Sequence, residues 1–217
     1  MWLWGLACLV AITISSLYLV RSGAHWVVAI FATSLALTAL SGNASALILP
    51  MLLGAWIFRD RPRIVGPLIA AAAAIKLTPI VLVLWLVATR RWVAIGAAAV
   101  ACLVIAGVSV LGSGIDAYAS WLTGVTGAAP SPNAIATTLG ISPAVVAALF
   151  SLPVVLLWRR DNLSFTAAVI AAALMTPALY FSAFALLAAV AAPWIRVPDC
   201  YPAATSSEGR TARAPSS

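Results

Sequence analysis

The stretch 64–88, IVGPLIAAAAAIKLTPIVLVLWLVA, carries one charged side chain, Lys76, in a run long enough to cross a membrane. Arginine clusters flank this stretch on both sides, at 59–63 and at 90–91. Short loops rich in Lys and Arg stay on the cytoplasmic side, so a single crossing would leave one cluster on the wrong face. Pro79 lacks a backbone N–H and disfavours helix at the residue before it. The stretch therefore predicts two helical halves that double back, with Lys76 near their tip.

Each half is too short to cross a bilayer alone. As helices, 64–75 and 80–88 would measure about 18 Å and about 14 Å, whereas the hydrocarbon core is about 30 Å thick. Irregular backbone at that depth is tolerated only where protein or water covers it. One kinked span with the 90–91 cluster outside remains an alternative, because the rule for basic loops has exceptions.

Composition extends the membrane interpretation to the whole chain. Of 217 residues, 64% are hydrophobic and 8% are charged, whereas water-soluble domains carry about 25% charged residues. Three runs have the length of single spans, 2–20, 92–111 and 141–158, and three more lie at 24–41, 44–58 and 164–195. The last run is interrupted at Thr176-Pro177 and is expected to double back as well. We predict an all-α, polytopic transmembrane helical bundle of about 6–8 membrane segments, including broken or re-entrant helices.

The chain divides into a transmembrane helical domain, 1–198, and a polar tail, 199–217, which is expected to be disordered. The longest polar loop, 112–140, contains no Lys or Arg. It should therefore lie on the extracytoplasmic side, together with the Gly42-Asn43 turn. High Ala and Arg content with a single Lys is typical of a GC-rich bacterial genome. We expect a multi-pass protein of a bacterial plasma membrane.

The net charge of +7 comes from 12 basic and 5 acidic residues. The arginines stand in short clusters between apolar runs, which favours contact with membrane lipids over a nucleic-acid partner. Three cysteines and the single His25 are too few and too scattered for a disulfide framework or a metal site. The sequence also lacks a P-loop, a Gly-rich nucleotide fingerprint and a Ser/His/Asp set. We expect no metal and no cofactor.

Lys76 is the only lysine in the chain and lies deep in an apolar run. A charge near the middle of a membrane costs a few kcal/mol, so such a residue is a functional candidate by default. None of the apolar runs contains an acidic residue that could pair with it. An anion such as a lipid phosphate is therefore its expected partner. The alternative is that Lys76 extends to the interface and has no function.

The polar loop contains the residue types of a sugar site. Tyr118 and Trp121 offer flat faces for a sugar ring, and Asn133 offers an amide for its hydroxyl groups. Asp116 is the one carboxylate expected outside apart from the tail, which makes it the candidate catalytic base. The alternatives are that Asp116 is a loop or helix-start residue and that Asn43 begins a helix.

Several short motifs, in this order, resemble those of a known family. They are Gly42-Asn43 opening a span, the basic turn at 59–63, Ile75-Lys76-Leu77-Thr78-Pro79, Thr89-Arg90-Arg91-Trp92, Gly112-Ser113-Gly114-Ile115-Asp116, Pro132-Asn133-Ala134 and Thr176-Pro177. The order and spacing are similar to those of bacterial polyprenol-phosphate-mannose-dependent mannosyltransferases. These enzymes form glycosyltransferase family 87 and have the GT-C membrane fold. The resemblance covers roughly residues 35–185.

This resemblance implies a GT-C-like fold and a hexosyltransferase activity. A mannosyl or related hexosyl unit would pass from a polyprenyl-phosphate-linked sugar to an extracytoplasmic acceptor, a glycolipid or glycan of the cell envelope. Lys76 would pair with the donor phosphate and stabilise it as the leaving group. Asn43 and Asn133 would contact sugar or phosphate.

The chain departs from the family in its N-terminal part. GT-C enzymes carry a catalytic carboxylate in a large outer loop after the first span, whereas only Arg21-Ser22-Gly23 separates the first two runs here. The resemblance thus implies that the first spans and the usual base are missing. The chain would then be inactive, or a partner chain would supply those spans. A non-catalytic integral membrane subunit and a small transporter with broken helices remain the alternatives.

Overall fold

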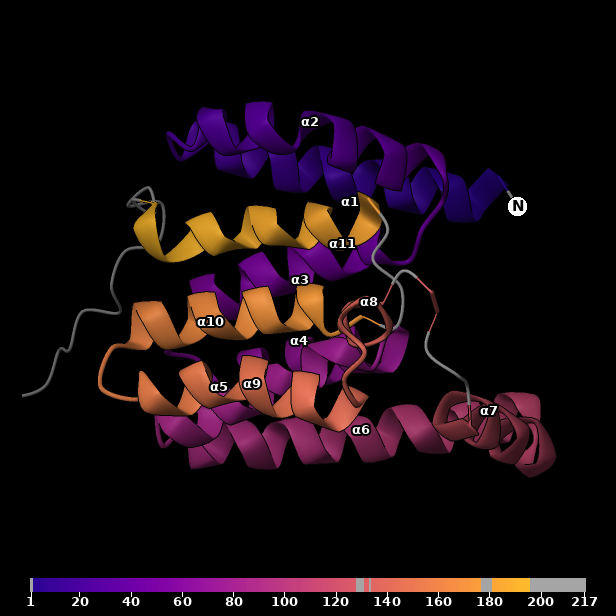
Figure 1. Cartoon of the computed structure of the whole chain (residues 1–217). Coiled ribbons are helices and arrows are strands. Elements are labelled where there is room, and N and C mark those ends of the chain that lie inside the picture. The colour runs from indigo at the N-terminus through magenta and orange to yellow at the C-terminus, as the bar shows by residue number, and fades with distance from the viewer. Residues whose placement is uncertain (1, 128–130, 133, 177–180, 196–217) are drawn as a thin grey trace, which may run out of the picture.

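The computed structural model describes residues 2–127, 131–132, 134–176 and 181–195, and the regular elements of this part of the chain are all helices. Most helices run side by side and reverse direction from one to the next (Figure 1). The all-α expectation is confirmed. The elements are α1 (Trp2–Arg21), α2 (His25–Leu40), α3 (Ser45–Ile57), α4 (Pro62–Ile75), the 3-10 helix η1 (Thr78–Val81), α5 (Leu82–Ala88), α6 (Trp92–Ser113), α7 (Ile115–Gly127), α8 (Ile135–Leu139), α9 (Pro143–Leu156), α10 (Asp161–Leu174), α11 (Phe181–Leu186) and the 3-10 helix η2 (Leu187–Trp194).

Small side chains allow the helices at the centre of the bundle to pack closely. Helices α1 and α2 lie along one side of the bundle and α6 along the other, with α3, α4 and α10 between them (Figure 1). On α10, Ala168, Ala171 and Ala172 are fully buried. In a membrane, helix association depends on close packing of such small residues, because lipid tails are as apolar as the helix surfaces.

The stretch around Lys76 doubles back as expected. Lys76 has extended backbone angles, φ −151° and ψ 130°, and ends α4. Beyond it, η1 and α5 return toward the start of α4. This reversal is evident from Asp161, because its carboxylate contacts both Arg59, which precedes α4, and Arg91, which follows α5. Because both arginine clusters lie at one end of the bundle, the alternative of a single kinked span is wrong.

The last apolar run also doubles back. Helix α10 ends at Leu174, and η2 packs back along it. Thr176 is buried at the reversal, whereas Pro177 lies outside the described residues. The expected tail, 199–217, lies outside them as well.

Two helices are long and apolar enough to span a membrane, α1 with 20 residues and α6 with 22. The run 141–158, expected to be a full span, forms a helix of only 14 residues. The hydroxyl oxygen of Ser142 accepts the backbone N–H of Val145 at 3.3 Å and Pro143 follows it, so α9 begins two residues inside the run. A turn at 157–160 ends the helix early.

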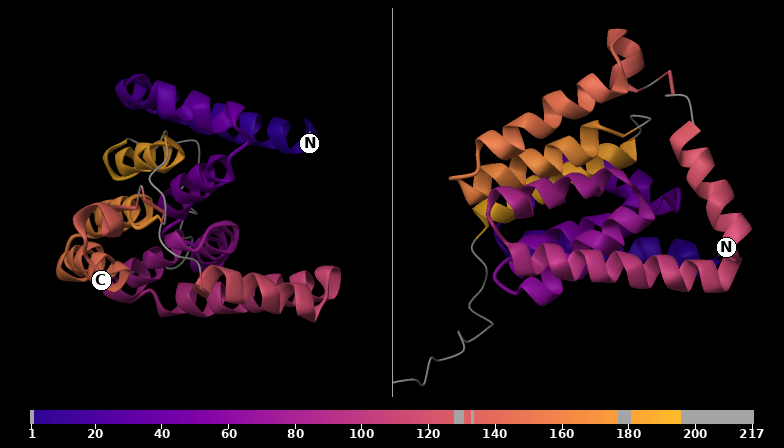
Figure 2. Two further views of the ribbon diagram at one scale, coloured as in Figure 1. Left: turned by 45° about the vertical axis from the view of Figure 1, so that its right-hand side comes forward. Right: turned by 90° about the horizontal axis from the view of Figure 1, so that it is seen from below.

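The expectation of one long polar loop at 112–140 is wrong, because it contains α7 and α8. Gly114 has φ +85° and ends α6. Asp116 in the first turn of α7 favours helix there through its interaction with the helix dipole. Helix α7 turns away from the axis of α6 (Figure 2), and it packs mainly on α6.

The bundle therefore has two distinct ends. We call the end with the turns at 21–24, 58–61, 89–91 and 157–160 the arginine end, since it carries Arg21, Arg59, Arg61, Arg90, Arg91, Arg159 and Arg160. The opposite end carries the turns of Asn43 and Lys76 together with the C-terminus of α6, and we call it the lysine end.

Candidate functional site

Lys76 and Thr78 form the turn between α4 and η1. Lys76 is half-buried, and its backbone N–H donates to the carbonyl oxygen of Ala72 at 3.1 Å. Within the part of the chain that the structure describes, its ammonium group has no ion pair. The Oγ1 atom of Thr78 is buried and likewise has no hydrogen-bond partner there. Two polar groups two residues apart are thus available to a ligand.

The Asn43 turn lies at the same end. Gly42 has φ +61°, a left-handed conformation that glycine adopts without strain, and its carbonyl accepts the indole N–H of Trp4 at 2.7 Å. The side-chain Oδ1 of Asn43 accepts the backbone N–H of Ser45 at 2.9 Å. Asn43 therefore stabilises the turn that leads into α3, and its amide nitrogen is left to contact a ligand.

Antiparallel packing relates these two turns. Helices α3 and α4 pack along each other in opposite directions. The start of α3, next to Asn43, therefore lies at the same end as the finish of α4, next to Lys76. Two of the predicted site residues are thus on one end of the bundle.

Asp116, Tyr118 and Trp121 lie on α7 rather than in a loop. The rings of Tyr118 and Trp121 are 5.7 Å apart at 34°, and the Trp121 side chain is exposed. The two rings form an aromatic surface on α7, which begins directly after the turn at Gly114 that ends α6. Because α7 packs mainly on α6, the structure does not bring these three residues into contact with Lys76. Asn133 lies outside the described residues.

Three carboxylates are described, and two of them lie at the arginine end. Asp60 and Asp161 both lie within 4.0 Å of arginine nitrogens. Asp116 follows the C-terminus of α6 and is exposed. Among the described residues, it is thus the one carboxylate at the lysine end.

A partly buried polar cluster at the arginine end was not predicted from the sequence. Asp161 accepts the indole N–H of Trp85 at 2.7 Å and a guanidinium N–H of Arg91 at 2.9 Å. Arg91 also lies over the ring of Trp85, 4.7 Å from its centroid. One helix turn after Asp161, the ring centroid of Phe165 lies 5.0 Å from the ring centroids of Trp56 and Trp85. This cluster joins α3, α5, α6 and α10.

Only one sequence signal could have pointed to this cluster. Asp161 is an acid placed directly after Arg159-Arg160, at the start of an apolar run. Its partners, however, lie 70 and 76 positions away, and neither hydropathy nor charge placement relates such distant residues.

Among the described residues, no group of three or more His, Cys, Asp or Glu side chains lies together as a metal site would require. Cys8 is buried beside the Asn43 turn and Cys102 is exposed on α6.

The described part of the chain is thus a bundle of apolar helices with the arginines of that part gathered at one end, which is the architecture of a membrane protein. The model of glycosyltransferase family 87 matches residues 1–207. The chain belongs to glycosyltransferase family 87, and this membership implies a membrane glycosyltransferase. The match extends beyond the roughly 35–185 covered by the motifs. Comparison with curated proteins and with solved structures gave no significant match.

Proposed function

We propose that the protein transfers a hexosyl unit, mannosyl in the first place, from a polyprenyl-phosphate-linked sugar to a glycolipid or glycan of the cell envelope. The observation that carries this proposal is the Lys76 turn. Among the described residues, the half-buried ammonium group of Lys76 has no ionic partner and the buried hydroxyl of Thr78, two residues on, has no hydrogen-bond partner. Together they offer a phosphate one charge and several hydrogen bonds.

In the transfer, the acceptor hydroxyl oxygen attacks C1 of the donor sugar. The bond between C1 and the phosphate oxygen breaks, and that oxygen keeps the electron pair. Lys76 and the hydroxyl of Thr78 stabilise the charge that develops on the leaving phosphate. The amide nitrogen of Asn43, on the neighbouring turn, is placed to contact the sugar or the phosphate, and Asn133 is proposed for the same role.

The acceptor proton needs a base. Asp116 is the candidate in this chain, because Asp60 and Asp161 are committed to arginines at the other end. Tyr118 and Trp121, one turn further along α7, would stack on a sugar ring. Helix α7 would have to approach the Lys76 turn for catalysis. Otherwise a partner chain supplies the base.

The proposed setting is a bacterial plasma membrane that the GT-C-like bundle crosses several times. The arginine end faces the cytoplasm, in agreement with the distribution of basic turns. The lysine end then lies toward the extracytoplasmic side, and α4, η1 and α5 form a re-entrant pair in which η1 and α5 pack against α10.

One observation favours a second candidate, a non-catalytic subunit that binds lipid-linked sugar. No described carboxylate lies within 4 Å of Lys76. A chain that holds the donor and relies on a partner for the base would show this arrangement.

The test is reconstitution of the full chain in liposomes with radiolabelled polyprenyl-phosphate-mannose and cell-envelope lipids as acceptor. Wild type should transfer label, and Lys76→Met should lower the rate about 100-fold, the magnitude of losing one contact to a developing anion. Arg21→Gln removes the same charge at the opposite end and should keep the rate. Binding without transfer would establish the second candidate instead, and neither binding nor transfer would overturn both.

A further inference from the structure

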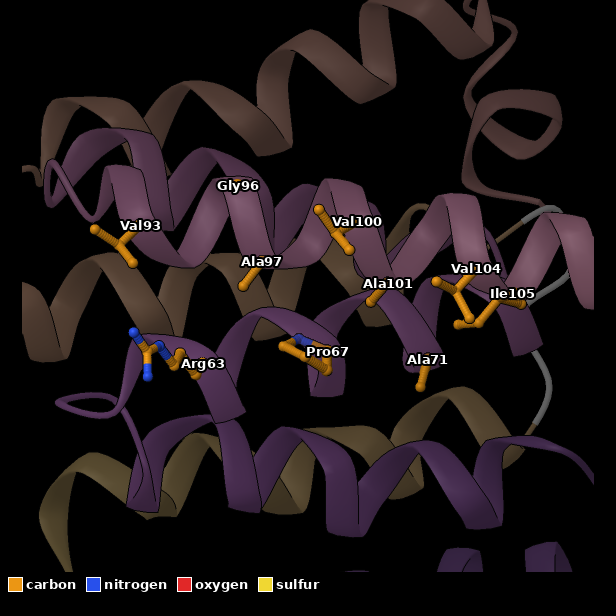
Figure 3. A pocket seen from close by; sticks show the side chains of 10 residues that line it. All are labelled: Arg63, Pro67, Ala71, Val93, Gly96, Ala97, Val100, Ala101, Val104 and Ile105. Carbon is orange, nitrogen blue, oxygen red and sulfur yellow. The ribbon is translucent and has the colours of Figure 1, made fainter.

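An apolar groove of about 710 Å³ runs between α4 and α6. Figure 3 shows Arg63 at one end of the groove, Pro67 and Ala71 along α4, and valine and isoleucine side chains of α6 opposite them. Apart from the guanidinium of Arg63, every side chain that lines the groove is apolar. The outer face of α6 beside it is exposed along its length, for example at Leu103 and Val104.

Close contact of the two helices at one point explains the floor of the groove. Gly66 of α4 lies against the backbone of α6, where a Cβ atom would come within 2.7 Å of the Ala98 nitrogen and would also meet the Ala94 carbonyl. Next to this contact, Gly96 has no side chain and Ala97 has only a methyl group, so neither residue fills the groove. At Gly96, an added Cβ would meet no atom within 4 Å.

The groove adjoins a second, polar hollow of about 350 Å³ at the arginine end, and Val93 lines both. Arg59, Arg90 and Arg91 line this hollow. Together with Arg63, these are four arginines against two nearby carboxylates, Asp60 in the hollow and Asp161 beside Arg91, so positive charge is in excess. One further nitrogen, Nη1 of Arg91, is buried without a hydrogen-bond partner among the described residues.

The hollow also receives the positive ends of two helix dipoles. Pro62 and Trp92, the first residues of α4 and α6, both line it. Neither helix has an acidic residue in its first turn or a side-chain cap. Helix N-termini of this kind favour anions.

The length of the groove fits one leaflet of a bilayer. From Val93 to Ile105, α6 rises about 18 Å at 1.5 Å per residue. Half of a hydrocarbon core of about 30 Å is about 15 Å. The groove thus begins at the arginine end and stops near the middle of the membrane. An acyl chain that enters from one leaflet needs a groove of this length. A second copy of the chain, packed helix against helix, would instead need a contact surface along all of α6.

We propose that this combined site binds an anionic phospholipid of the leaflet at the arginine end. The phosphate lies among Arg63 and the arginines of the hollow, and one acyl chain lies in the groove between α4 and α6. The exposed indole of Trp92 lies at the headgroup level, where tryptophan is enriched. The site is at the opposite end of α4 from Lys76, so the bound lipid is separate from the proposed sugar donor.

Native mass spectrometry of the purified full chain tests the acyl-chain half of the site. After reconstitution with equal amounts of phosphatidylglycerol and phosphatidylcholine, wild type should retain phosphatidylglycerol. Gly96→Leu fills the groove without a clash and should abolish retention. Gly107→Leu is the matched control, because it lies on the same helix, also has open space, and lies outside the groove; it should retain lipid as wild type does.

Charge variants test the headgroup half. Arg63→Gln should lower the preference for phosphatidylglycerol about five-fold, the usual effect of one arginine near an anionic lipid. Arg21→Gln removes an equal charge at the same end but on α1, and should leave the preference unchanged. Equal retention of the two lipids by wild type, or equal effects of Gly96→Leu and Gly107→Leu, would overturn the proposal. So would a dimer that Gly96→Leu converts to a monomer, since the occupant would then be a second copy of the chain.

Discussion

The indole N–H of Trp85 donates to Oδ1 of Asp161 at 2.7 Å, across 76 positions of the sequence. The other carboxylate oxygen accepts from Arg91 at 2.9 Å. The first helix turn of α10 is thereby joined to α5 and to the start of α6. This single carboxylate fixes the end of the returning α4–α5 pair against the rest of the bundle.

Replacing Asp161 with Ala should destabilise the protein by about 2 kcal/mol. The change removes a hydrogen bond to a charged acceptor, leaves the Trp85 indole without its partner, and leaves Arg91 partly buried without its nearest carboxylate. Reversible unfolding in mixed micelles measures the loss. Asp60→Ala is the control, because its side chain is 79% exposed and its ion pairs are no shorter than 3.8 Å. Its effect should stay below about 1 kcal/mol, and equal losses for the two variants would contradict this account.

Most helices of the bundle could be predicted from the sequence, because hydropathy and charge act locally along the chain. The reversal at Lys76 followed from two arginine clusters that favour the same face, and the structure places Arg59 and Arg91 on one carboxylate. The cluster around Asp161 could not be predicted, since it depends on residues that meet only after packing. The helix α7 was missed for another reason. Its glycines and polar residues are typical of a loop, whereas Asp116 and the break at Gly114 together allow a new helix to begin.

The residues of the candidate site likewise divide into those that the sequence indicates and those that it does not. Lys76 stood out because a lone charge in an apolar run is visible in sequence. Thr78 did not, because its importance lies in burial and in the lack of a partner, and a threonine before proline is otherwise unremarkable. The groove between α4 and α6 was equally hidden, since it depends on Gly66 lying against α6 while Gly96 leaves open space beside that contact.

Gly66→Ala should destabilise the bundle by about 1–3 kcal/mol. The added methyl group would overlap the Ala94 carbonyl and the Ala97 side chain on α6, so the two helices must separate. Gly107→Ala, placed in open space on α6, should instead gain up to about 1 kcal/mol from higher helix propensity. Unfolding midpoints of the two variants measured side by side provide the comparison, and a neutral Gly66→Ala would mean that α4 and α6 are not in close contact.

Cysteine labelling should show that both arginine turns lie on one face of the membrane. In a background with Cys8, Cys102 and Cys200 replaced by alanine, Asp60→Cys and Arg90→Cys should react with a membrane-impermeant maleimide only when the cytoplasmic face is accessible.

The matched position for the other face is Ser41→Cys, an exposed residue of the turn before Asn43. It should react from outside in intact cells. If the cysteines at positions 60 and 90 reacted from opposite faces, the re-entrant arrangement would be wrong, whatever the outcome at position 41.

Thr78→Val separates a role in ligand binding from a role in the fold. In the free protein the hydroxyl is buried and has no hydrogen-bond partner within the described part of the chain, and such an unsatisfied group costs about 1–3 kcal/mol. A valine of the same shape removes that cost, so the free energy of unfolding should stay equal or rise. The proposed contact with the donor phosphate disappears at the same time, so affinity for polyprenyl-phosphate-mannose should fall about ten-fold, the equivalent of one hydrogen bond to a charged group. Thr78→Ser keeps the hydroxyl and should keep donor affinity. A loss of stability in Thr78→Val without a change in donor affinity would assign the hydroxyl to the fold and leave Lys76 alone at the phosphate.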